Sequence, residues 1–409
     1  MEVLHARCAG LDVHKDSVVA CARVVAGSRA SHETEEFATT TSGLLKLADW
    51  LRERHCTHVA MEATGVYWKP VWHVLDGGGF ELLLVNPAHA RNVPGRKSDV
   101  NDAHWLADLL AHGLVRPSFV PPPPIQELRD LTRTRKQLVR QVGRHTLRIE
   151  KTLEDANLKL TGVISDLLGT SGRAILKALI AGETDPERLL ARTTGRLEAP
   201  RGRLLEGLRG VVTDHHRFML KLHLRQIEAL KAAIAQLERR MEKLLRPFRE
   251  RVEQLDTIPG VDVTVAQVLI AEIGLDMTRF PTAGHLVSWA GLCPRMDESA
   301  GKRRSTRVRK GAPWLKTTLV TAGWGAAASR DTYLRAQFVR LKTRRGPQKA
   351  VVAVAASILT AAYYILRDHV TYRELGPDYF DRRDRKSVLR RLTRRIAALG
   401  YEVELRPVA

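Results

Sequence analysis

The sequence predicts an α/β domain at the N-terminus, followed by two mainly helical regions. Short apolar runs alternate with amphipathic stretches over residues 1–120, a pattern typical of packed strands and helices. Four consecutive prolines at 121–124 interrupt this pattern. Beyond them, long segments carry apolar residues at every third or fourth position. A chain of 409 residues suffices for two or three domains, and we place them at 1–120, 121–250 and 251–409.

The expected order in the first domain is three strands, then a helix, a strand, a helix, a strand and a final helix. Short runs rich in Val, Ala and Leu predict the strands, at 8–13, 18–25, 35–40, 58–61 and 80–85. Thr41 or Ser42 is expected to cap the first helix. The second helix spans about 66–75 and ends at three glycines. The final helix is expected over 98–112.

One long helix is expected from Ile125 to about Leu160. Its cations recur every three or four residues and form a basic stripe along one face, consisting of Arg129, Arg133, Lys136, Arg140, Arg144, Arg148 and Lys151. Only Asp130 offsets this charge before Glu150, so the stripe indicates contact with nucleic acid. The alternative is a solvated flank of a coiled coil.

A second long helix is expected over 216–248. Its apolar residues follow an a/d pattern, which predicts pairing with the preceding long helix or with another subunit, at Ile227, Leu230, Ile234, Leu237, Met241, Leu244 and Phe248. The intervening residues 161–215 predict only short helices. Residues 255–274 resemble a helix-hairpin-helix, whose turn binds phosphate through backbone amides. A plain helical hairpin fits the same pattern.

The net charge of +21 is distributed unevenly. It amounts to −2 over residues 1–120, +10 over 121–250 and +13 over 251–409. Between Ser299 and Ala350 there are 14 Lys and Arg residues and one acid, Asp331. The mutual repulsion of these cations favours binding to a polyanionic partner, most plausibly through its phosphate groups. A hydrophobic content of 44% argues against a disordered polycation.

Several other classes of protein are disfavoured. The four cysteines are far apart with no CxxC pair, which argues against a local zinc ribbon and for reduced thiols in the cytosol. The N-terminus lacks the pattern of a signal peptide. Residues 350–366 are uncharged but lie at the lower limit of the length that spans a bilayer, so we expect a buried helix and no membrane partner.

Four acids are expected to meet at one edge of the first domain. Asp12 ends the first strand, Glu62 follows the fourth, and Asp99 and Asp102 begin the final helix with a spacing that places both on one face. Clustered carboxylates are the ligands that Mg²⁺ uses in phosphodiester chemistry. Each acid alone has a simpler role, such as capping a helix. Nearby histidines, including His14, His89, His104 and His112, show no zinc-ligand spacing and are expected to be ordinary.

The chain resembles a known family over most of its length. The motifs GLDVHK, MEATG-Y, LVNP and KSDVNDA are similar to the N-terminal domain of DEDD-type bacterial transposases of the insertion-sequence one-ten family. The segments IPGVDVTVAQVLIAEIG, FPTAGHLVSWAGLCP and ESAGKRRSTRVRKG resemble the C-terminal transposase domain of that family. The resemblance implies an RNase H-like, RuvC-like N-terminal domain, a long helical coiled-coil middle and a mainly helical C-terminal domain with a helix-hairpin-helix-like turn.

The resemblance also implies roles for individual residues. The metal-binding catalytic acids correspond to Asp12, Glu62, Asp99 and Asp102, and the nucleophilic serine corresponds to Ser299. Ala300 stands where some members have glycine after the serine, so Ser305 is the alternative. A serine hydroxyl needs activation, which metal held by the acids could supply. Cations after the serine could hold the scissile phosphate or neighbouring backbone, namely Lys302, Arg303, Arg304, Arg307, Arg309 and Lys310.

Members of that family are site-specific DNA recombinases that form a covalent serine–DNA intermediate. The resemblance therefore implies Mg²⁺, with two ions per active site, and DNA partners at the element ends and target. It also implies a structured bridge RNA that supplies sequence specificity by base pairing. A homo-oligomer, dimer or tetramer, with composite active sites is expected. The expected location is the bacterial cytoplasm, in association with the nucleoid during activity.

Two alternatives remain open. A metal-only nuclease or Holliday-junction resolvase would cleave with water or a DNA hydroxyl and form no serine–DNA intermediate. A non-catalytic nucleic-acid-binding protein would have no use for acids that face phosphate, so the presence of all four disfavours it.

Overall fold

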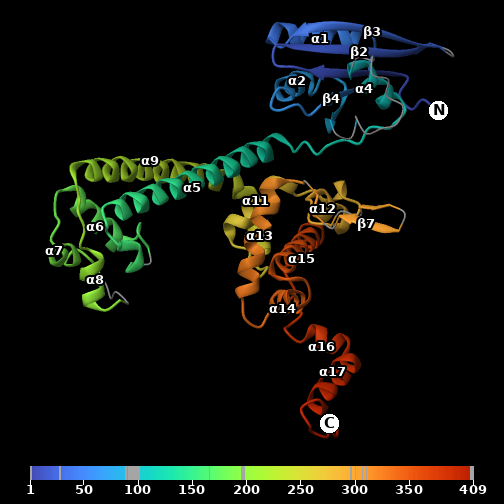
Figure 1. The fold of residues 1–409 in the computed structure, drawn as a ribbon. Helices are drawn as coiled ribbons and strands as arrows, with labels where there is room; N and C mark the ends of the chain where they lie inside the picture. The colour runs from blue at the N-terminus through green and yellow to red at the C-terminus, as the bar shows by residue number, and fades with distance from the viewer. Residues whose placement is uncertain are drawn as a thin grey trace. The chain divides into compact units, whose positions relative to one another are not determined.

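The computed structural model describes residues 2–26, 29–87, 90, 102–164, 166–194, 199–294, 297–299, 301–305, 307–309 and 311–405. The chain forms two compact units, Met1–Val120 and Pro121–Ala409, each of which is described by itself. Figure 1 shows a sheet with helices in the first unit and helices almost throughout the second. A further boundary near residue 250 stays a prediction.

The first unit contains one mixed sheet. Its strands are β1 (Arg7–Val13), β2 (Ser17–Ala26), β3 (Arg29–Ala38), β4 (His58–Glu62) and β5 (Glu81–Val85). They lie in the order β3-β2-β1-β4-β5. The β1–β2 and β2–β3 pairs are antiparallel, whereas β1–β4 and β4–β5 are parallel. The order of strands and helices expected from the sequence is confirmed, and it is consistent with the RNase H-like domain that the resemblance implied.

Helices cover both faces of this sheet (Figure 1). Alternate residues of a strand point to opposite faces, so one set of β1 side chains, including Leu11, packs with α1 (Thr41–Glu53) and α2 (Trp68–Leu75). The other set, including Cys8, packs with α4 (Asp102–Ala111). The buried faces of α1 and α2 contain the apolar residues that their 3.6-residue periodicity predicts.

Helix α4 approaches β1 closely because β1 has a glycine beneath it. A Cβ at Gly10 would lie 2.2 Å from the Ala103 carbonyl oxygen and 2.5 Å from the Ala107 amide nitrogen. The Cys8 thiol donates to the Ala107 carbonyl at 3.5 Å, and the Leu4 amide donates to the Ala111 carbonyl at 2.8 Å. From Leu4 through Cys8 to Gly10, the contacted residues of α4 run backwards from Ala111 through Ala107 to Ala103. Helix α4 is therefore antiparallel to β1. The N-terminus of α4 therefore lies at the carboxyl end of β1.

Two details of the first unit differ from the prediction. Strand β3 begins at Arg29, not near residue 35, because its early residues are polar and exposed and give no apolar signal. The cap of α1 is Thr40, whose hydroxyl accepts from the Gly43 amide, and not Thr41 or Ser42. The start expected for α4 at residue 98 lies outside the described residues.

Two long helices pack together in the second unit, α5 (Pro123–Asp155) and α9 (Asp214–Leu245). The predicted pairing of the second long helix with the first is thereby confirmed. The segment between them forms a 3₁₀ turn and short helices, as expected: Leu160–Gly162, α6 (Thr170–Ile180), α7 (Pro186–Leu190) and α8 (Arg201–Gly207). The two ends of α5 enter different cores, with Leu128 in one and Ile149 in the other.

Among the described residues, the elements in the rest of the second unit are helices and one hairpin. They comprise a 3₁₀ turn at Arg246–Phe248, α10 (Arg249–Asp256), α11 (Val263–Ile273), a 3₁₀ turn at Met277–Arg279, α12 (Ala283–Trp289), β6 (Asp297–Ser299), β7 (Lys302–Ser305), α13 (Pro313–Ala328), α14 (Tyr333–Arg345), α15 (Pro347–Asp368), α16 (Tyr379–Arg383) and α17 (Arg385–Ala397). The turn between α10 and α11 falls where the sequence predicted one.

Helix α15 contains the uncharged segment at residues 350–366. It is long and apolar enough to cross a membrane by length and composition. In this unit it packs against α12, α13 and α14, and its residues from Ala350 to Leu366 contribute repeatedly to the core. The expectation of a buried helix is therefore confirmed.

Substitution Gly10→Ala is expected to destabilise the first unit by about 1–3 kcal/mol, because the added methyl group meets backbone atoms of α4 and cannot be accommodated by a side-chain rotation. Hydrogen–deuterium exchange should show faster exchange in β1 and α4, with the second unit unchanged. Gly143→Ala in α5 is the control, since a Cβ there has no neighbour within 4 Å. Equal protection of α4 in wild type and Gly10→Ala would contradict this account of the packing.

Candidate active site and nucleic-acid interface

Asp12 and Glu62 lie at the carboxyl ends of neighbouring parallel strands, one residue before the end of β1 and at the end of β4. Leu11 and Met61 are register partners in the β1–β4 pair, and the two acids follow them directly. Cys8 and Ala60 pack on the α4 face of the sheet, and side chains alternate, so Asp12 and Glu62 point to that same face. Because α4 begins at the carboxyl end of β1, Asp102 starts its helix at this edge. We name Asp12, Glu62 and Asp102 the acidic edge.

The acidic edge is partly open to solvent. The Asp12 side chain is one-fifth exposed, and its Oδ2 lies 3.3 Å from His14 Nε2. Glu62 and Asp102 are half-buried. Asp99, the fourth predicted ligand, lies outside the described residues. Cys8, near the opposite end of β1, is a poor nucleophile, because burial raises the pKa of its thiol to about 12. All four cysteines are free thiols.

Ser299 is the last residue of β6, which pairs with β7 in an antiparallel hairpin. Its register partner is Lys302, and Gly301 between them has a φ of +73°, a conformation that favours glycine in a tight turn. The sequence did not predict this hairpin. The side chains of Ser299, Arg303 and Arg304, and all of Lys310, lie outside the described part of the structure. Lys302, Arg307 and Arg309 are exposed.

The first two residues of the basic stripe, Arg129 and Arg133, bond to residues of α11 within the protein. Arg133 forms a bidentate pair with Glu272 of α11, with Nε–Oε1 and Nη2–Oε2 both at 2.8 Å. Glu272 is only 2% exposed. Arg129 donates to the carbonyl oxygens of Ala271 and Glu272 at 2.9 Å, and burial lowers its pKa to about 10. We name Arg129, Arg133 and Glu272 the α5 clamp.

Lys136, one turn further along α5, also has internal partners. Its Nζ donates to the hydroxyls of Thr317 and Thr318 and to the Trp314 carbonyl of α13. Burial lowers its pKa. Arg133 and Lys136 therefore already have hydrogen-bonding partners inside the protein, and their contact with nucleic acid stays a prediction.

The remaining stripe is exposed. Arg140, Arg144, Arg148 and Lys151 all face solvent on α5. Their spacing of four, four and three residues keeps them on one side of the helix. The Arg140 guanidinium also lies 5.6 Å from the centre of the Trp314 ring. This outer stripe is the part of α5 best suited to contact phosphates.

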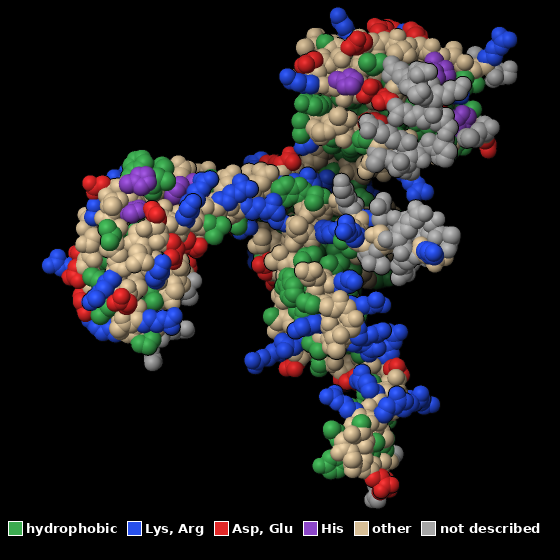
Figure 2. All heavy atoms as spheres, viewed as in Figure 1, with side chains coloured by type: hydrophobic (Ala, Val, Ile, Leu, Met, Phe, Trp, Pro, Cys, Tyr) green, Lys and Arg blue, Asp and Glu red, His purple; other side chains and the backbone are tan. Residues whose placement is uncertain are grey.

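A second cationic surface lies near the C-terminus and combines part of the basic segment at residues 299–350 with Arg391, which the sequence analysis did not single out. Lys and Arg side chains gather around the region of α14 to α17 in Figure 2. A groove there is lined by residues of α14, including Arg335, Arg340 and Arg344, and by Arg391 of α17. Arg340 lies over the Phe380 ring at 5.1 Å, and the Phe380 ring stacks on Tyr333. Arginines beside aromatic rings form a surface that suits nucleic acid.

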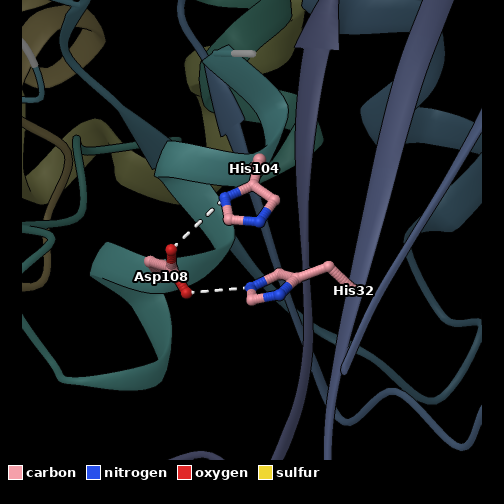
Figure 3. A group of neighbouring side chains, drawn as sticks. All are labelled: His32, His104 and Asp108. Carbon is pink, nitrogen blue, oxygen red and sulfur yellow. Dashed lines mark hydrogen bonds and ion pairs between the residues drawn. The ribbon is translucent and has the colours of Figure 1, made fainter. Parts of the chain in front are cut away.

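The structure also brings together three side chains that the sequence interpretation treated as ordinary or did not mention. His32 of β3 lies beside His104 and Asp108 of α4, as Figure 3 shows. Burial lowers the pKa of His104. In the sequence, only the spacing of His104 and Asp108, four residues apart and so on one face of a helix, indicated that these side chains could act together. The partner His32 could not be anticipated, because the start of β3 was missed.

Comparisons with known proteins place the chain among DNA-mobilising proteins. Residues 9–157 match a family described as "Transposase", and residues 252–339 match the "Transposase IS116/IS110/IS902 family". A pilin gene-inverting protein of Moraxella bovis is 23% identical over 381 residues, which cover 88% of this chain and 95% of the relative, and that of Moraxella lacunata gives the same figures. An uncharacterized 43.6 kDa protein of insertion element IS110 from Streptomyces coelicolor is 34% identical over 30% of each chain.

Glu272→Ala is expected to destabilise the second unit by roughly 3 kcal/mol, because it leaves two guanidinium groups partly buried without their carboxylate. The measurement is the free energy of unfolding from urea denaturation. Glu253→Ala is the matched control, since Glu253 pairs with Arg249 at an exposed position and should change stability by less than about 1 kcal/mol. Equal effects of the two substitutions would show that the α5 clamp does not stabilise the unit.

Proposed function

We propose that this chain, which belongs to the IS110 family of transposases, cuts and rejoins DNA by Mg²⁺-assisted attack of a serine hydroxyl on a phosphodiester. The observation that carries the proposal is the acidic edge, where two adjacent parallel strands carry acids at their carboxyl ends and a helix begins with a third. Carboxylates gathered beside nucleic acid are repelled by phosphate unless a cation lies between them.

The residues of the acidic edge fit a hard divalent cation. Asp12, Glu62 and Asp102, with Asp99 from the family pattern, offer only oxygen donors, which Mg²⁺ prefers. When bound there, two Mg²⁺ ions would neutralise charge on the scissile phosphate and favour the ionised form of an attacking hydroxyl. The carboxylates would hold and orient these ions.

Ser299 is the proposed nucleophile. Its Oγ forms a bond to phosphorus while the bond from phosphorus to a deoxyribose oxygen breaks. The serine loses its proton to solvent, and the leaving oxygen takes one up. Attack by a DNA hydroxyl on the phosphoserine ester reverses these changes and rejoins the strand, so no external oxidant or energy source is required. The position of Ser299 at the end of a hairpin strand, directly before a run of cations, supports this role.

We assign recognition of the DNA sequence to a bridge RNA that forms base pairs with the DNA. The cations proposed for the protein contact phosphates, which position nucleic acid without reading its sequence. The outer stripe and the C-terminal groove add to the cations that follow Ser299. The relatives named as pilin gene-inverting proteins match 88% of this chain, and their name supports DNA rearrangement as its activity.

The acids and the serine belong to different compact units. We therefore propose composite active sites in a homo-oligomer, a dimer or tetramer, in which acids and serine can come from different subunits. Such an assembly would act on DNA in the bacterial nucleoid.

Ser299→Ala is expected to abolish a covalent protein–DNA adduct, because the variant lacks the oxygen that bonds to phosphorus. The assay is a denaturing gel of full-length protein incubated with labelled element-end DNA, its flanking RNA and Mg²⁺. Ser305→Ala, in the same hairpin, is the matched control and should retain the adduct. Loss of the adduct in Ser305→Ala alone would move the nucleophile to Ser305, and metal-dependent cleavage without any adduct would favour a metal-only nuclease.

Asp12→Ala is expected to reduce cleavage by at least about 10³-fold while leaving DNA binding intact, since removal of one metal-binding carboxylate removes transition-state stabilisation and little binding. Single-turnover cleavage and filter binding measure the two properties separately. Asp49→Ala, an exposed acid on α1, is the control and should retain cleavage. Cleavage at the wild-type rate by Asp12→Ala would overturn the assignment of the acidic edge.

The triple variant Arg140→Ala, Arg144→Ala, Arg148→Ala is expected to weaken DNA binding, because fewer phosphates are neutralised by the protein. The slope of log affinity against log salt should fall by about 1 for each phosphate that no longer has a cationic partner. Fluorescence anisotropy over a range of salt concentrations measures both. The matched control replaces Arg188, Arg201 and Arg209, exposed cations that are paired with acids. An unchanged slope in the first variant would show that the outer stripe does not bind phosphate.

A further inference from the structure

The side chains His32, His104 and Asp108 form a compact group between β3 and α4. Their possible ligand atoms all lie within 4.8 Å of one another. In Figure 3 the two imidazole rings lie face to face, with Asp108 beside both. The ring centroids are 3.7 Å apart and the planes differ by 26°. We name these three residues the histidine–aspartate group.

The distances within this group match those between ligands of one metal ion. His104 Nδ1 lies 3.3 Å from Asp108 Oδ2, and His32 Nε2 lies 3.0 Å from Asp108 Oδ1. Two nitrogen or oxygen ligands on a tetrahedral Zn²⁺ are separated by about 3.3 Å, given metal–ligand bonds of about 2.0–2.1 Å. Small side-chain rotations would therefore suffice to place one ion among the three.

The hydrogen bonding of the group is incomplete without a further partner. His104 Nδ1 is buried, and apart from its 3.3 Å approach to Asp108 Oδ2 it makes no contact with hydrogen-bond geometry in the part of the chain that the structure describes. Buried polar atoms are rarely left in that state. Asp108, by contrast, is held in place, because Arg23 Nε donates to its Oδ1 at 2.9 Å. Carboxylate ligands of metals are commonly oriented by such a hydrogen bond, and it leaves Oδ2 directed at His104.

We propose that His32, His104 and Asp108 bind a first-row transition-metal ion of the Zn²⁺ class, in a three-ligand site that links β3 to α4. Two imidazole nitrogens favour such an ion over Mg²⁺, which prefers oxygen. The site is therefore chemically distinct from the acidic edge, which offers only carboxylates. The positive charge of Arg23, only 7% exposed, opposes a dication nearby and so favours reversible binding over permanent retention.

The proposed ion would affect the acidic edge only indirectly. Helix α4 carries His104 and Asp108 on the turns that follow Asp102. A metal bridge from α4 to an edge strand of the sheet would hold the helix, and with it the first residue of the helix, against the sheet. The ion is a structural link in this proposal and takes no part in phosphodiester chemistry.

The test uses untagged full-length protein, stripped of metal by chelator and titrated with Co²⁺ and with Zn²⁺. We expect one equivalent of Co²⁺ to give the visible absorption of a low-symmetry, four-coordinate complex, and Zn²⁺ to displace it. His32→Ala and His104→Ala should each weaken Zn²⁺ binding by at least about 10-fold. His73→Ala and His285→Ala, which remove histidines outside the group, should bind as wild type. Equal affinity in all five proteins would overturn the proposal.

A second measurement separates loss of the site from loss of the fold. Zn²⁺ should raise the midpoint of thermal unfolding of the wild type and leave that of His32→Asn unchanged, because an ion that binds only the folded state stabilises it. The metal-free midpoint of each protein is its own reference, since His32→Asn also loses the contacts of His32 with Asp108 and His104. Asp12→Ala should keep the Zn²⁺ response, so that failure of the proposed catalytic site leaves this test intact. A Zn²⁺-induced rise in His32→Asn equal to that in the wild type would contradict the proposal.

Discussion

The close packing of α4 on β1 is the constraint on which the arrangement of acids depends. It requires that β1 have no side chain at Gly10, where backbone atoms of α4 occupy the space that a Cβ would need. The antiparallel direction of α4 then brings its first residue to the strand end that carries Asp12. Backbone packing thus brings three acids that are distant in sequence to one edge. Their charges oppose this arrangement, because like charges repel.

The second unit shows how a strongly basic chain can still build a stable interior. Its cations divide into those with internal acceptors, such as the guanidinium groups of the α5 clamp, and those left in solvent along the outer stripe. Glu272 makes this division possible, because one buried carboxylate satisfies Arg133 and approaches Arg129. A count of charge along the sequence does not distinguish the two groups, although their consequences for binding are different.

Much of the fold could be predicted from the sequence, because buried strands and amphipathic helices have strong periodic patterns. Strands β1, β4 and β5 are apolar runs, and the long helices follow the 3.6-residue repeat. Strand β3 was only partly found, since an exposed edge strand such as RASHETEEFA has no apolar face beyond Phe37. The hairpin at Ser299 depends on turn geometry at Gly301, and the histidine–aspartate group depends on pairing between β3 and α4. Such contacts between distant segments have no local signal in a single sequence.

The length of α5 sets the separation between the two cores in which its ends are packed. At 1.5 Å per residue its 33 residues span about 50 Å, the length of roughly 15 base pairs of duplex. The α5 clamp holds the helix near one end, whereas Ile149 and Leu153 belong to a separate core at the other. The helix is therefore a rigid spacer between two packed bodies within its unit. Changing its length by one residue would rotate one body against the other by about 100° as well as move it, so its length is constrained in whole turns.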